Sequence, residues 1–313
     1  MSSSCAGNAE RPYAVGVDGG GSKTLAVVVD AQGREQGRGL AGSSNYNTVG
    51  LEQAARNIHR AVEQAAQVAG CRLPLQSAWL GLAGIDHARD HALLAPYFQS
   101  LAGTVRLTSD AELVLSALDD AVGVALIAGT GSIALGRDAH GLVTRAGGWG
   151  HILGDEGSGY DIGRRSLQAA ARASDGRGPT TSLLMLILSH WQLQNAGELI
   201  GKVYGNNDKA VVAALSALAF DAARAGDQVA SEIVLQAATE LALAAVTVCD
   251  AINAPGEGTS VALGGGLLLH EADFRARVLD CMRQSRPIEQ VVLVENPALS
   301  AARAALRLAR SNV

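Results

Sequence analysis

The sequence predicts an α/β fold built from two related domains, and two observations support that prediction. The first is a repeated pattern in which apolar runs are joined by a glycine-rich turn and then by a turn that begins with aspartate. This pattern covers residues 13–41 and returns at residues 122–146. The second is the length of 313 residues, about twice the ~150 that is typical of one domain. Together they indicate a duplicated sheet with helices packed around each copy.

The first copy has the order of a three-stranded meander. An apolar run at residues 13–17 meets the glycine-rich segment 18–24, and a second apolar run follows at once at residues 25–29. The turn Asp30-Ala-Gln-Gly then leads into a third run that ends near Ala41. Because each turn is followed directly by an apolar run, no helix fits between these strands.

The second copy repeats this order. An apolar run at residues 122–127 enters the turn Ala128-Gly-Thr-Gly-Ser132, and residues 133–135 resume the apolar pattern. The turn Asp138-Ala-His-Gly occupies the place that Asp30-Ala-Gln-Gly holds in the first copy, and a third apolar run follows it. The matching turns are the strongest sign of an internal repeat.

Apolar periodicity predicts the remaining elements. They are helices at 51–69 and 89–98, a helix from Asp110, helices within 158–173 and 208–252, a helix at 297–309, and strands at 78–82, 104–107, 260–263 and 290–294. The segment Ala-Pro-Gly-Glu-Gly at 254–258 ends the long helical run. We expect the last helix to return to the first domain, which gives domains of residues 1–118 with 296–313, and 119–295 with a helical insertion.

Composition excludes several classes of function. The net charge is −5 without a basic patch, which argues against a nucleic-acid partner. The four cysteines are Cys5, Cys71, Cys249 and Cys281. Their wide spacing gives neither a zinc site nor a disulfide framework and suits a reducing compartment.

Acidic residues interrupt the apolar segment 233–252, so we expect a buried helix there. Residues 1–11 lack the apolar core of a signal peptide. These features predict a soluble cytoplasmic protein without a membrane partner.

The first glycine-rich turn, Asp18-Gly-Gly-Gly-Ser-Lys-Thr24, allows two interpretations. It does not match a P-loop because Ser22 precedes Lys23, and it does not match a dinucleotide-binding turn because a strand follows it. It is either a plain hairpin or a hairpin whose backbone N–H groups bind phosphate, with Lys23 and Thr24 as polar neighbours. Asp18 either holds a metal through water or caps the turn.

Two further glycine segments follow predicted strands. Gly129-Thr-Gly131 opens the second meander, and Gly264-Gly-Gly266 follows the strand at 260–263. The turn at residues 138–141 comes too soon for the helix that a dinucleotide site would need. Three such segments favour phosphate binding over purely structural turns.

Two segments supply candidate acids. Asp110 follows a predicted strand, and Ser109-x-x-Glu112 has the pattern of a capping box, so we expect Asp110 in the first turn of a helix. This position stabilises a helix, and it also keeps a carboxylate ionised, as an acceptor of a hydroxyl proton must be. The segment 147–158, Gly-Gly-Trp-Gly-His-Ile-Leu-Gly-Asp-Glu-Gly-Ser, either is a mobile loop with helix-leading acids or binds a sugar through backbone, tryptophan and carboxylate.

From Asp18 to Arg303 these motifs resemble the BadF/BadG/BcrA/BcrD-type ATPase family, and within it the N-acetylglucosamine and glucosamine kinases. Many actin-like ATPases share the glycine turns, whereas the segment 147–158 is much more specific. The resemblance implies two actin-like, ribonuclease H-like domains with a nucleotide and sugar cleft between them. It implies ATP-dependent phosphorylation of an amino sugar, N-acetylglucosamine to its 6-phosphate first and glucosamine second. A homodimer is a possible assembly.

The resemblance also implies roles for individual residues. ATP phosphates and Mg²⁺ are assigned to Asp18, Gly20, Gly21, Ser22, Lys23, Thr24, Gly129, Thr130 and Gly131, with Asp18 at the metal. The adenosine pocket is assigned to Gly264, Gly265, Gly266 and Leu267. The sugar is assigned to Asn45, Ser132, Gly148, Trp149, Gly150 and Asp155. Asp110 is the implied general base on the sugar 6-hydroxyl.

Two differences from related families narrow the choice among the possible enzyme classes. The ROK sugar kinases carry a cysteine-rich zinc motif, and nothing of that kind follows His151. An ATPase that activates a 2-hydroxyacyl-CoA dehydratase-type partner is the alternative from another class. Its iron–sulfur cluster needs cysteines near the glycine segments, whereas Cys249 and Cys281 lie well outside the third of them.

Overall fold

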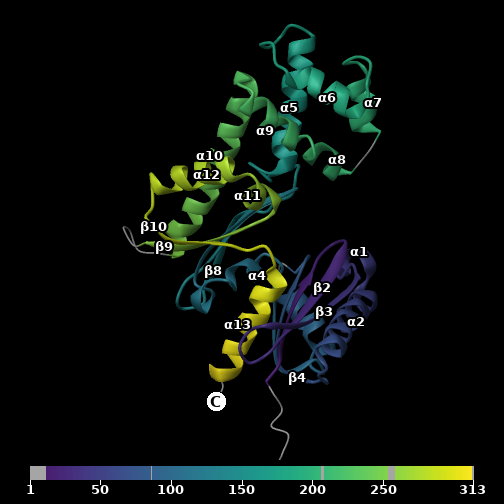
Figure 1. The fold of residues 1–313 in the computed structure, drawn as a ribbon, viewed down its shortest axis with the longest axis vertical. Helices are drawn as coiled ribbons and strands as arrows, with labels where there is room; N and C mark the ends of the chain where they lie inside the picture. Colours follow the sequence, from purple (N-terminus) through teal and green to yellow (C-terminus); the bar gives the residue numbers. More distant parts are fainter. Residues whose placement is uncertain (1–11, 86, 206–207, 253–257, 312–313) are drawn as a thin grey trace, which may run out of the picture. The chain divides into compact units, whose positions relative to one another are not determined.

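The computed structural model describes residues 12–85, 87–205, 208–252 and 258–311 of the chain (Figure 1). The chain divides into two compact units. Unit 1 is Met1–Ala121 with Asn296–Val313, and unit 2 is Val122–Glu295. Cys5, the N-terminal segment 1–11 and most of the predicted helix break at 254–258 lie outside the described residues.

Unit 1 contains a five-stranded sheet in the order β3-β2-β1-β4-β5. The strands are β1 (Ala14–Gly19), β2 (Lys23–Val29), β3 (Glu35–Gly42), β4 (Leu75–Leu82) and β5 (Ala102–Ser109). β1, β2 and β3 form an antiparallel meander, whereas β1, β4 and β5 are parallel neighbours. The carboxyl ends of these three parallel strands therefore meet at one edge of the sheet.

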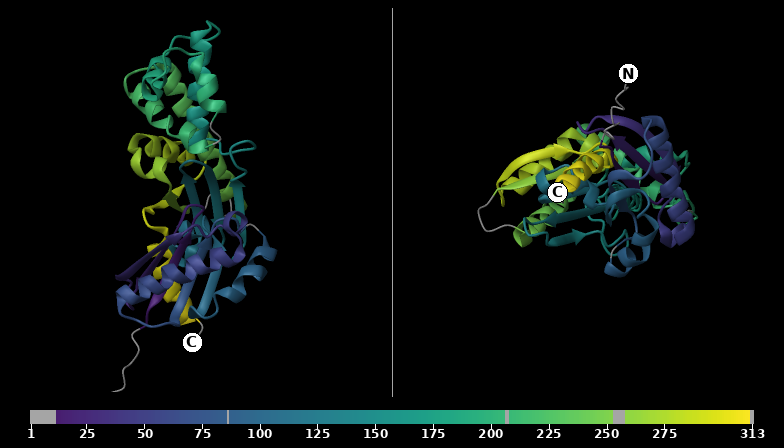
Figure 2. Two further views of the ribbon diagram at one scale, coloured as in Figure 1. Left: turned by 90° about the vertical axis from the view of Figure 1, so that its right-hand side faces the viewer. Right: turned by 90° about the horizontal axis from the view of Figure 1, so that it is seen from below.

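Helices cover both faces of this sheet. They are α1 (Tyr46–Val49), α2 (Leu51–Ala69), α3 (Ala88–Leu94), α4 (Glu112–Leu115) and α13 (Pro297–Ser311), with 3₁₀ turns at Ala95–Tyr97 and Asp119–Ala121. Val15 and Val17 of β1 share a buried cluster with Ile58 of α2. Gly16, between them, faces α13. Because side chains alternate along a strand, α2 and α13 lie on opposite faces (Figure 2).

Unit 2 repeats the topology with the order β10-β9-β6-β7-β8. The strands are β6 (Gly123–Ala128), β7 (Ser132–Arg137), β8 (Val143–Gly147), β9 (Thr259–Gly264) and β10 (Ile288–Leu293). The first three form an antiparallel meander, and β6, β9 and β10 are parallel. The predicted duplication is therefore confirmed, since both sheets connect their strands in the same order.

The two aspartate-led turns have the same hydrogen bonds. In each, the aspartate Oδ1 accepts from the backbone N–H groups two and four residues later, at 2.8 to 3.0 Å. In each, the glycine three residues later donates its N–H to the aspartate carbonyl. Gly33 and Gly141 occupy that place with φ of 73° and 88°, a backbone conformation that favours glycine. Asp30 and Asp138 are thus equivalent in structure as well as in sequence.

The helices of unit 2 follow its meander and separate β8 from β9 and β9 from β10. They are α5 (Gly159–Ser174), α6 (Leu183–Trp191), α7 (Glu198–Tyr204), α8 (Lys209–Ala213), α9 (Ser216–Arg224), α10 (Gln228–Ile252), α11 (Gly266–His270) and α12 (Ala272–Arg283). By length and composition α10 could cross a membrane, but half of its apolar window is buried inside the unit. Ala237, Leu241 and Ala245 belong to the core. The expectation of a buried helix at 233–252 fits this packing.

Two predicted helical segments differ from the structure. The run at 208–252 is divided into α8, α9 and α10, because Gly226 turns with φ of 90° and Asp227 accepts the N–H of Ala230 to begin α10. The helix α12 was not predicted. The expected helix from Asp110 is also wrong, since β5 continues to Ser109 and α4 is a single turn that begins at Glu112 without a side-chain cap.

We predict that Gly16→Ala destabilises the protein by ~1–3 kcal/mol, the usual cost of overpacking a close contact. A Cβ at Gly16 would collide with the carbonyl oxygen of Ala298 and the backbone nitrogen of Ala302 in α13. Urea unfolding measures the change. Gly201→Ala in α7 is the matched control, because its Cβ would meet no atom within 4 Å, and alanine in a helix gains up to ~1 kcal/mol. Equal stability of the two variants would contradict the close packing of β1 on α13.

Candidate functional site

Two carboxylates lie at the carboxyl edge of the sheet in unit 1. Asp18 is the last residue but one of β1, and Asp110 directly follows β5. β4 lies between these two parallel strands, so both side chains belong to the same edge. Asp18 is half-buried, whereas Asp110 is exposed and its Oδ1 accepts the N–H of Ala111 at 2.9 Å. This edge holds the acids that the sequence analysis assigned to the metal and to general base catalysis.

Asp18 has an altered acidity. Its pKa is raised from 3.8 to about 6. Burial is the largest cause, the negative charge of Asp110 also raises the pKa, and the positive charge of Lys23 lowers it. The effect of Asp110 on Asp18 shows that the two acids interact electrostatically. A cation between or beside two such carboxylates would remove this repulsion.

The first glycine-rich turn leaves the same edge. Its backbone is closed by a hydrogen bond of 2.9 Å from the N–H of Gly20 to the carbonyl of Lys23. Gly21, Ser22 and Lys23 are exposed. A Cβ at Gly21 would meet no atom within 4 Å, so packing within this chain does not require glycine there. Close approach of a ligand to the backbone would require it.

Thr24 does not lie with the exposed part of this turn. Its side chain is fully buried, and its hydroxyl donates to the carbonyl of Gly42 at 2.7 Å. That hydroxyl holds the end of β3 to the start of β2, and the expected place of Thr24 at the ATP phosphates stays a prediction. Its role in this conformation is structural.

Asn45 lies beside the first turn. Its Oδ1 accepts the N–H of Asn47 at 3.0 Å and so caps the short helix α1. It also lies close to Gly84, where a Cβ would be 2.9 Å from Oδ1. The backbone N–H of Ser44 donates to the carbonyl of Gly20, which places Asn45 next to the turn. Unit 1 thus brings together Asp18, the first turn, Asn45 and Asp110.

In unit 2 the second glycine turn lies against the start of α5. The N–H of Gly129 donates to the carbonyl of Gly131 at 2.9 Å and closes the turn. The carbonyls of Gly129 and Thr130 accept from Gly159 and Tyr160, at 2.8 and 3.2 Å. These bonds fix the turn to the first residues of α5, where helical N–H groups favour a negative charge.

The third glycine segment lies next to the second turn. Gly265 has φ of 83°, and a Cβ there would collide with the carbonyl oxygen of Ala128 at the end of β6. A Cβ at Gly129 would lie 3.9 Å from the Cα of Gly265 and 3.8 Å from the nitrogen of Gly266. Leu267 follows in α11 and is half-buried. Unit 2 therefore brings its two glycine segments together at the carboxyl ends of β6 and β9.

Asp155 and Ser132 connect the segment 147–158 to the second turn. Asp155 is 4% exposed, and its Oδ1 accepts the N–H of Ser132 at 3.2 Å. The Ser132 hydroxyl donates to the carbonyl of Glu156 at 2.8 Å. A Cβ at Gly131 would lie 2.9 Å from Asp155 Oδ2. In this conformation both predicted sugar residues hold the loop in place.

The tip of the same segment is exposed. Gly148 and Gly150 have φ of 71° and 79°, and they flank Trp149, which is 61% exposed. The Arg145 guanidinium lies 4.8 Å from the centre of the Trp149 ring, as in a cation–π pair. An exposed indole on a glycine-rich loop is available to a ligand.

Sequence reasoning missed Asp161 in this region. It is buried in the first turn of α5 and accepts hydrogen bonds from the N–H of Gly157 and from Arg164 and Arg165. Burial acts to raise its pKa, but the hydrogen bonds of Arg165 and Arg164 lower the pKa below its usual range. An aspartate three residues after Ser158 was the available signal, since that serine accepts the Asp161 N–H as the N-cap of α5.

Residues 12–85, 87–205, 208–252 and 258–311 contain no group of three or more His, Cys, Asp or Glu side chains that could hold a metal. A metal bound by Asp18 would therefore not have three such side chains as ligands among the described residues. Mg²⁺ commonly binds in this way, through one or two carboxylates, substrate phosphates and water.

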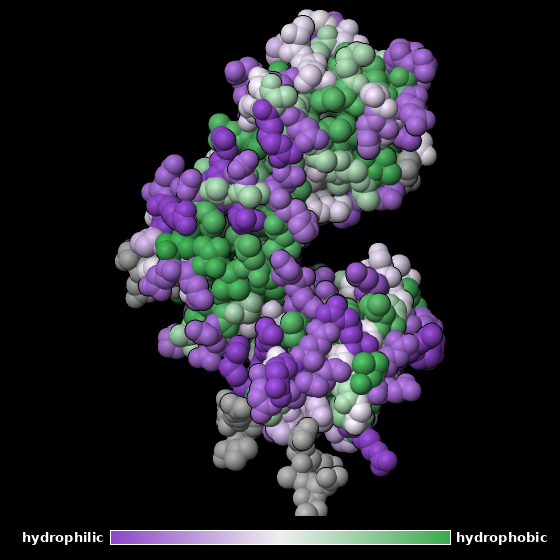
Figure 3. Space-filling model, in the orientation of Figure 1, coloured by the Kyte–Doolittle hydropathy of each residue, from purple (hydrophilic) through white to green (hydrophobic). Residues whose placement is uncertain are grey.

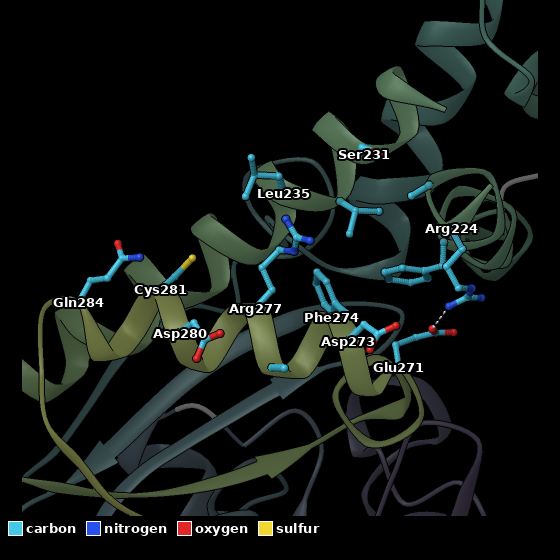
Figure 4. Close-up of a pocket in the computed structure, with 14 residues that line it drawn as sticks. Arg224, Ser231, Leu235, Glu271, Asp273, Phe274, Arg277, Asp280, Cys281 and Gln284 are labelled. Carbon is cyan, nitrogen blue, oxygen red and sulfur yellow. Dashed lines mark hydrogen bonds and ion pairs between the residues drawn. The ribbon is translucent and has the colours of Figure 1, made fainter. Parts of the chain in front are cut away.

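A groove of about 670 Å³ lies elsewhere in unit 2, along α9, α10 and α12 (Figure 4). Its floor includes Phe220 and Phe274, and an ion pair of 2.8 Å joins Arg224 to Glu271 at one end. Figure 3 shows apolar residues over this part of unit 2. The groove contains none of the residues predicted for the site.

Comparisons with known proteins show what this chain is similar to. The chain matches the model of the BadF/BadG/BcrA/BcrD ATPase family over residues 15–293. It is 33% identical to an N-acetylmuramic acid/N-acetylglucosamine kinase of Clostridium acetobutylicum over 82% of this chain and 85% of that protein. It is 36% identical to an N-acetyl-D-glucosamine kinase of Dictyostelium discoideum over 72% of this chain and 76% of that protein. A provisionally identified N-acetylglucosamine kinase from Chromobacterium violaceum has a similar structure, with a TM-score of 0.70, 25% identity and coverage of 95% and 99% of the two chains.

We predict that Asp18→Asn stabilises the protein at about pH 8 by up to ~3 kcal/mol, because a raised carboxyl pKa is a cost to folding. The folded pKa is about 6 and the ordinary value is 3.8. Asp18 therefore costs nothing below the ordinary value, and its full cost is present above the folded value. Asparagine carries no charge at either pH. Chemical unfolding without nucleotide or divalent metal, at about pH 8 and about pH 4, measures the difference. Equal stability of the two proteins at the higher pH would contradict the buried charge.

Proposed function

Since this chain belongs to the BadF/BadG/BcrA/BcrD ATPase family, we propose that it is an ATP-dependent kinase that converts N-acetylglucosamine to N-acetylglucosamine 6-phosphate. The observation that supports this most directly is the edge of unit 1. There Asp18, Asp110 and a glycine turn with exposed backbone lie at the ends of neighbouring strands. A phosphoryl-transfer enzyme needs these three components, namely a cation site, a proton acceptor and a phosphate cradle.

The nucleotide phosphates are assigned to backbone groups of the two glycine turns. The N–H groups of Gly20 and Gly129 close the two turns, which leaves the N–H groups of Gly21 in unit 1 and of Thr130 and Gly131 in unit 2 as the proposed phosphate donors. Lys23 adds a positive charge at the first turn. Gly264 to Leu267, next to the second turn, would line the adenosine. These roles follow from the family and from the position of each segment at a strand end.

Asp18 fits a magnesium ion. Its carboxylate is half-buried, interacts with a second carboxylate and has a raised pKa, so a divalent cation would stabilise its ionised form. Mg²⁺ held by Asp18 and by phosphate oxygens would neutralise charge on the transferred group. Without such a cation, the ionised Asp18 would oppose the approach of a nucleotide.

Asp110 is the proposed general base. It is exposed at the sheet edge and near Asp18, and one carboxylate oxygen is bonded to the N–H of Ala111. That bond orients the carboxylate. The other oxygen would accept the proton of the sugar 6-hydroxyl as its oxygen forms a bond to the γ-phosphorus and the bond to ADP breaks. Asn45, beside the first turn, would hold another sugar hydroxyl.

The sugar is also assigned to the segment 147–158 of unit 2. Its tip offers the exposed Trp149 ring and the backbone of Gly148 and Gly150, which suit the flat face and the hydroxyls of a sugar. Asp155 and Ser132 would act mainly by fixing this loop, given their present hydrogen bonds. The free thiols Cys71, Cys249 and Cys281 suit a cytoplasmic enzyme.

We predict that the purified protein releases ADP from ATP only when an amino sugar and Mg²⁺ are both present. A coupled assay over a panel of free hexoses measures this, and N-acetylglucosamine should give the highest kcat/KM. A higher kcat/KM for glucosamine would replace the proposed substrate. Equal ADP release with and without any hexose would contradict the proposed kinase activity.

We predict that Asp110→Asn lowers kcat by about 10²–10⁴, the usual contribution of a positioned base. The amide can still bond to the N–H of Ala111, so the fold and the sugar KM should change little. Steady-state kinetics and a melting curve measure both effects. Asp119→Asn is the matched control, because it removes an exposed carboxylate of the same unit to which no role in the reaction is assigned. A folded Asp110→Asn enzyme with the kcat of the control would exclude Asp110 as the base.

A further inference from the structure

One buried group at the edge of unit 1 is explained neither by the fold nor by the roles assigned above. Ser44 is 1% exposed, and its hydroxyl has no hydrogen-bond partner among the described residues. A buried hydroxyl without a partner is costly, and native proteins contain few of them. Such a group indicates a partner that the described residues do not supply in this conformation, namely water, a ligand or the neighbouring backbone in a second conformation.

The position of Ser44 favours a second conformation. Its hydroxyl lies against Gly19, where a Cβ would collide with it. Gly19 is the last residue of β1 and the first step into the phosphate turn. The pairing of β1 on both sides includes Gly19, so the backbone that can rotate relative to this hydroxyl is that of the turn from Gly20 onward.

The segment that carries Ser44 is attached directly to the turn. The N–H of Ser44 donates to the carbonyl of Gly20 at 3.2 Å, and the Ser43 hydroxyl reaches the same oxygen at 3.4 Å. The Ser43 hydroxyl also accepts the N–H of Asn45 at 3.2 Å. A short chain of hydrogen bonds thus runs from the phosphate turn to the proposed sugar residue.

The other end of the segment is anchored in the core of unit 1. Thr24 donates to the carbonyl of Gly42 at 2.7 Å, and the Asn57 side chain of α2 donates to the carbonyl of Ser43 at 2.6 Å. With these points fixed, a displacement of Gly20 cannot be absorbed by moving the whole segment. It must pass to Ser44 and Asn45.

We propose that Ser44 is a positioning residue that couples sugar binding at Asn45 to nucleotide binding at the turn Gly20 to Lys23. When phosphate occupies the turn, the Ser44 hydroxyl gains a hydrogen bond to the turn backbone and holds Asn45 in the sugar-binding arrangement. Each ligand then tightens the binding of the other, because linkage requires the effect to be reciprocal. This inference rests on the proposed function, since it takes the turn and Asn45 as the two ligand sites.

The test is Ser44→Ala in the full chain. Titration calorimetry measures the affinity for a non-hydrolysable ATP analogue with Mg²⁺, alone and with saturating N-acetylglucosamine. We expect the sugar to tighten the analogue about 10-fold in the wild-type protein, within the usual range of coupling between sites. In Ser44→Ala this factor should fall to about 1. The melting temperature without ligands should stay the same or rise, because the substitution removes an unsatisfied hydroxyl.

Ser77→Ala is the matched control. Ser77 is also fully buried with a hydroxyl that has no partner among the described residues, and it lies in β4 of the same sheet. It pairs with Ala14 at the beginning of β1, at the opposite edge from the turn. It should therefore keep the coupling factor of the wild-type protein and show the same small change in melting temperature.

The outcomes separate the two levels of the argument. A wild-type protein that binds neither the analogue nor an amino sugar would overturn the proposed function and, with it, the coupling. A wild-type protein that binds both, with the same coupling factor in Ser44→Ala, would overturn the role of Ser44 alone. Loss of coupling in Ser77→Ala as well would show that any buried hydroxyl of this sheet has the effect, and would equally overturn it.

Discussion

Parallel pairing of β1, β4 and β5 is the constraint on which the candidate site depends. The carboxyl ends of parallel strands lie at the same edge of a sheet, so residues that are far apart in the sequence come close together there. Asp18 and Asp110 are separated by 91 intervening residues, yet the charge of one raises the pKa of the other. The antiparallel pairing of β1 with β2 adds the glycine turn to the same edge. A purely parallel sheet could not do this, because a tight turn joins only antiparallel strands.

The edge of the sheet in unit 1 lowers the stability of the fold, because two of its polar groups are buried without a suitable partner. Asp18 is a partly buried carboxylate beside another carboxylate, and Ser44 is a buried hydroxyl without a partner among the described residues. Each would be better satisfied in the presence of a cation or a phosphate than in the protein alone. Such groups are typical of sites where function and stability conflict. The aspartate-led turns show the opposite, since Asp30 and Asp138 each accept two backbone N–H groups within their own turn.

Local patterns predicted what local interactions determine. The helix at 51–69 was predicted to its bounds, because apolar spacing and the flanking Gly50 and Gly70 mark it clearly. The duplication was visible because both aspartate-led turns need the same residues. The helix at Asp110 was predicted wrongly, because Ser109 is paired with Leu82 in the sheet and α4 begins only at Glu112, three residues later. No sequence pattern reports that pairing.

The candidate site shows the same division. The glycine segments and the acids could be selected from the sequence, since each type of residue suits a known chemistry. Their roles could not be separated further, because the direction of a side chain depends on tertiary packing. Thr24 belongs to the predicted phosphate motif, but its hydroxyl is bonded to Gly42. Asp155 was selected as a sugar ligand, but its carboxylate is bonded to the N–H of Ser132. Asp161 was missed because its importance lies in two arginines that fold back on it.

The two copies of the fold have diverged at the positions that carry charge. β1 and β6 have the same pattern of burial, with a half-buried residue at the fifth place, and this residue is Asp18 in unit 1 but Ile127 in unit 2. The strand registers place Asn296 where unit 1 has Asp110, and its Oδ1 caps α13 instead. The second copy of the repeat therefore has a glycine turn but no carboxylate at these two places. A carboxylate edge opposes a polyanionic nucleotide unless a cation neutralises it, whereas an edge of backbone N–H groups without carboxylates does not.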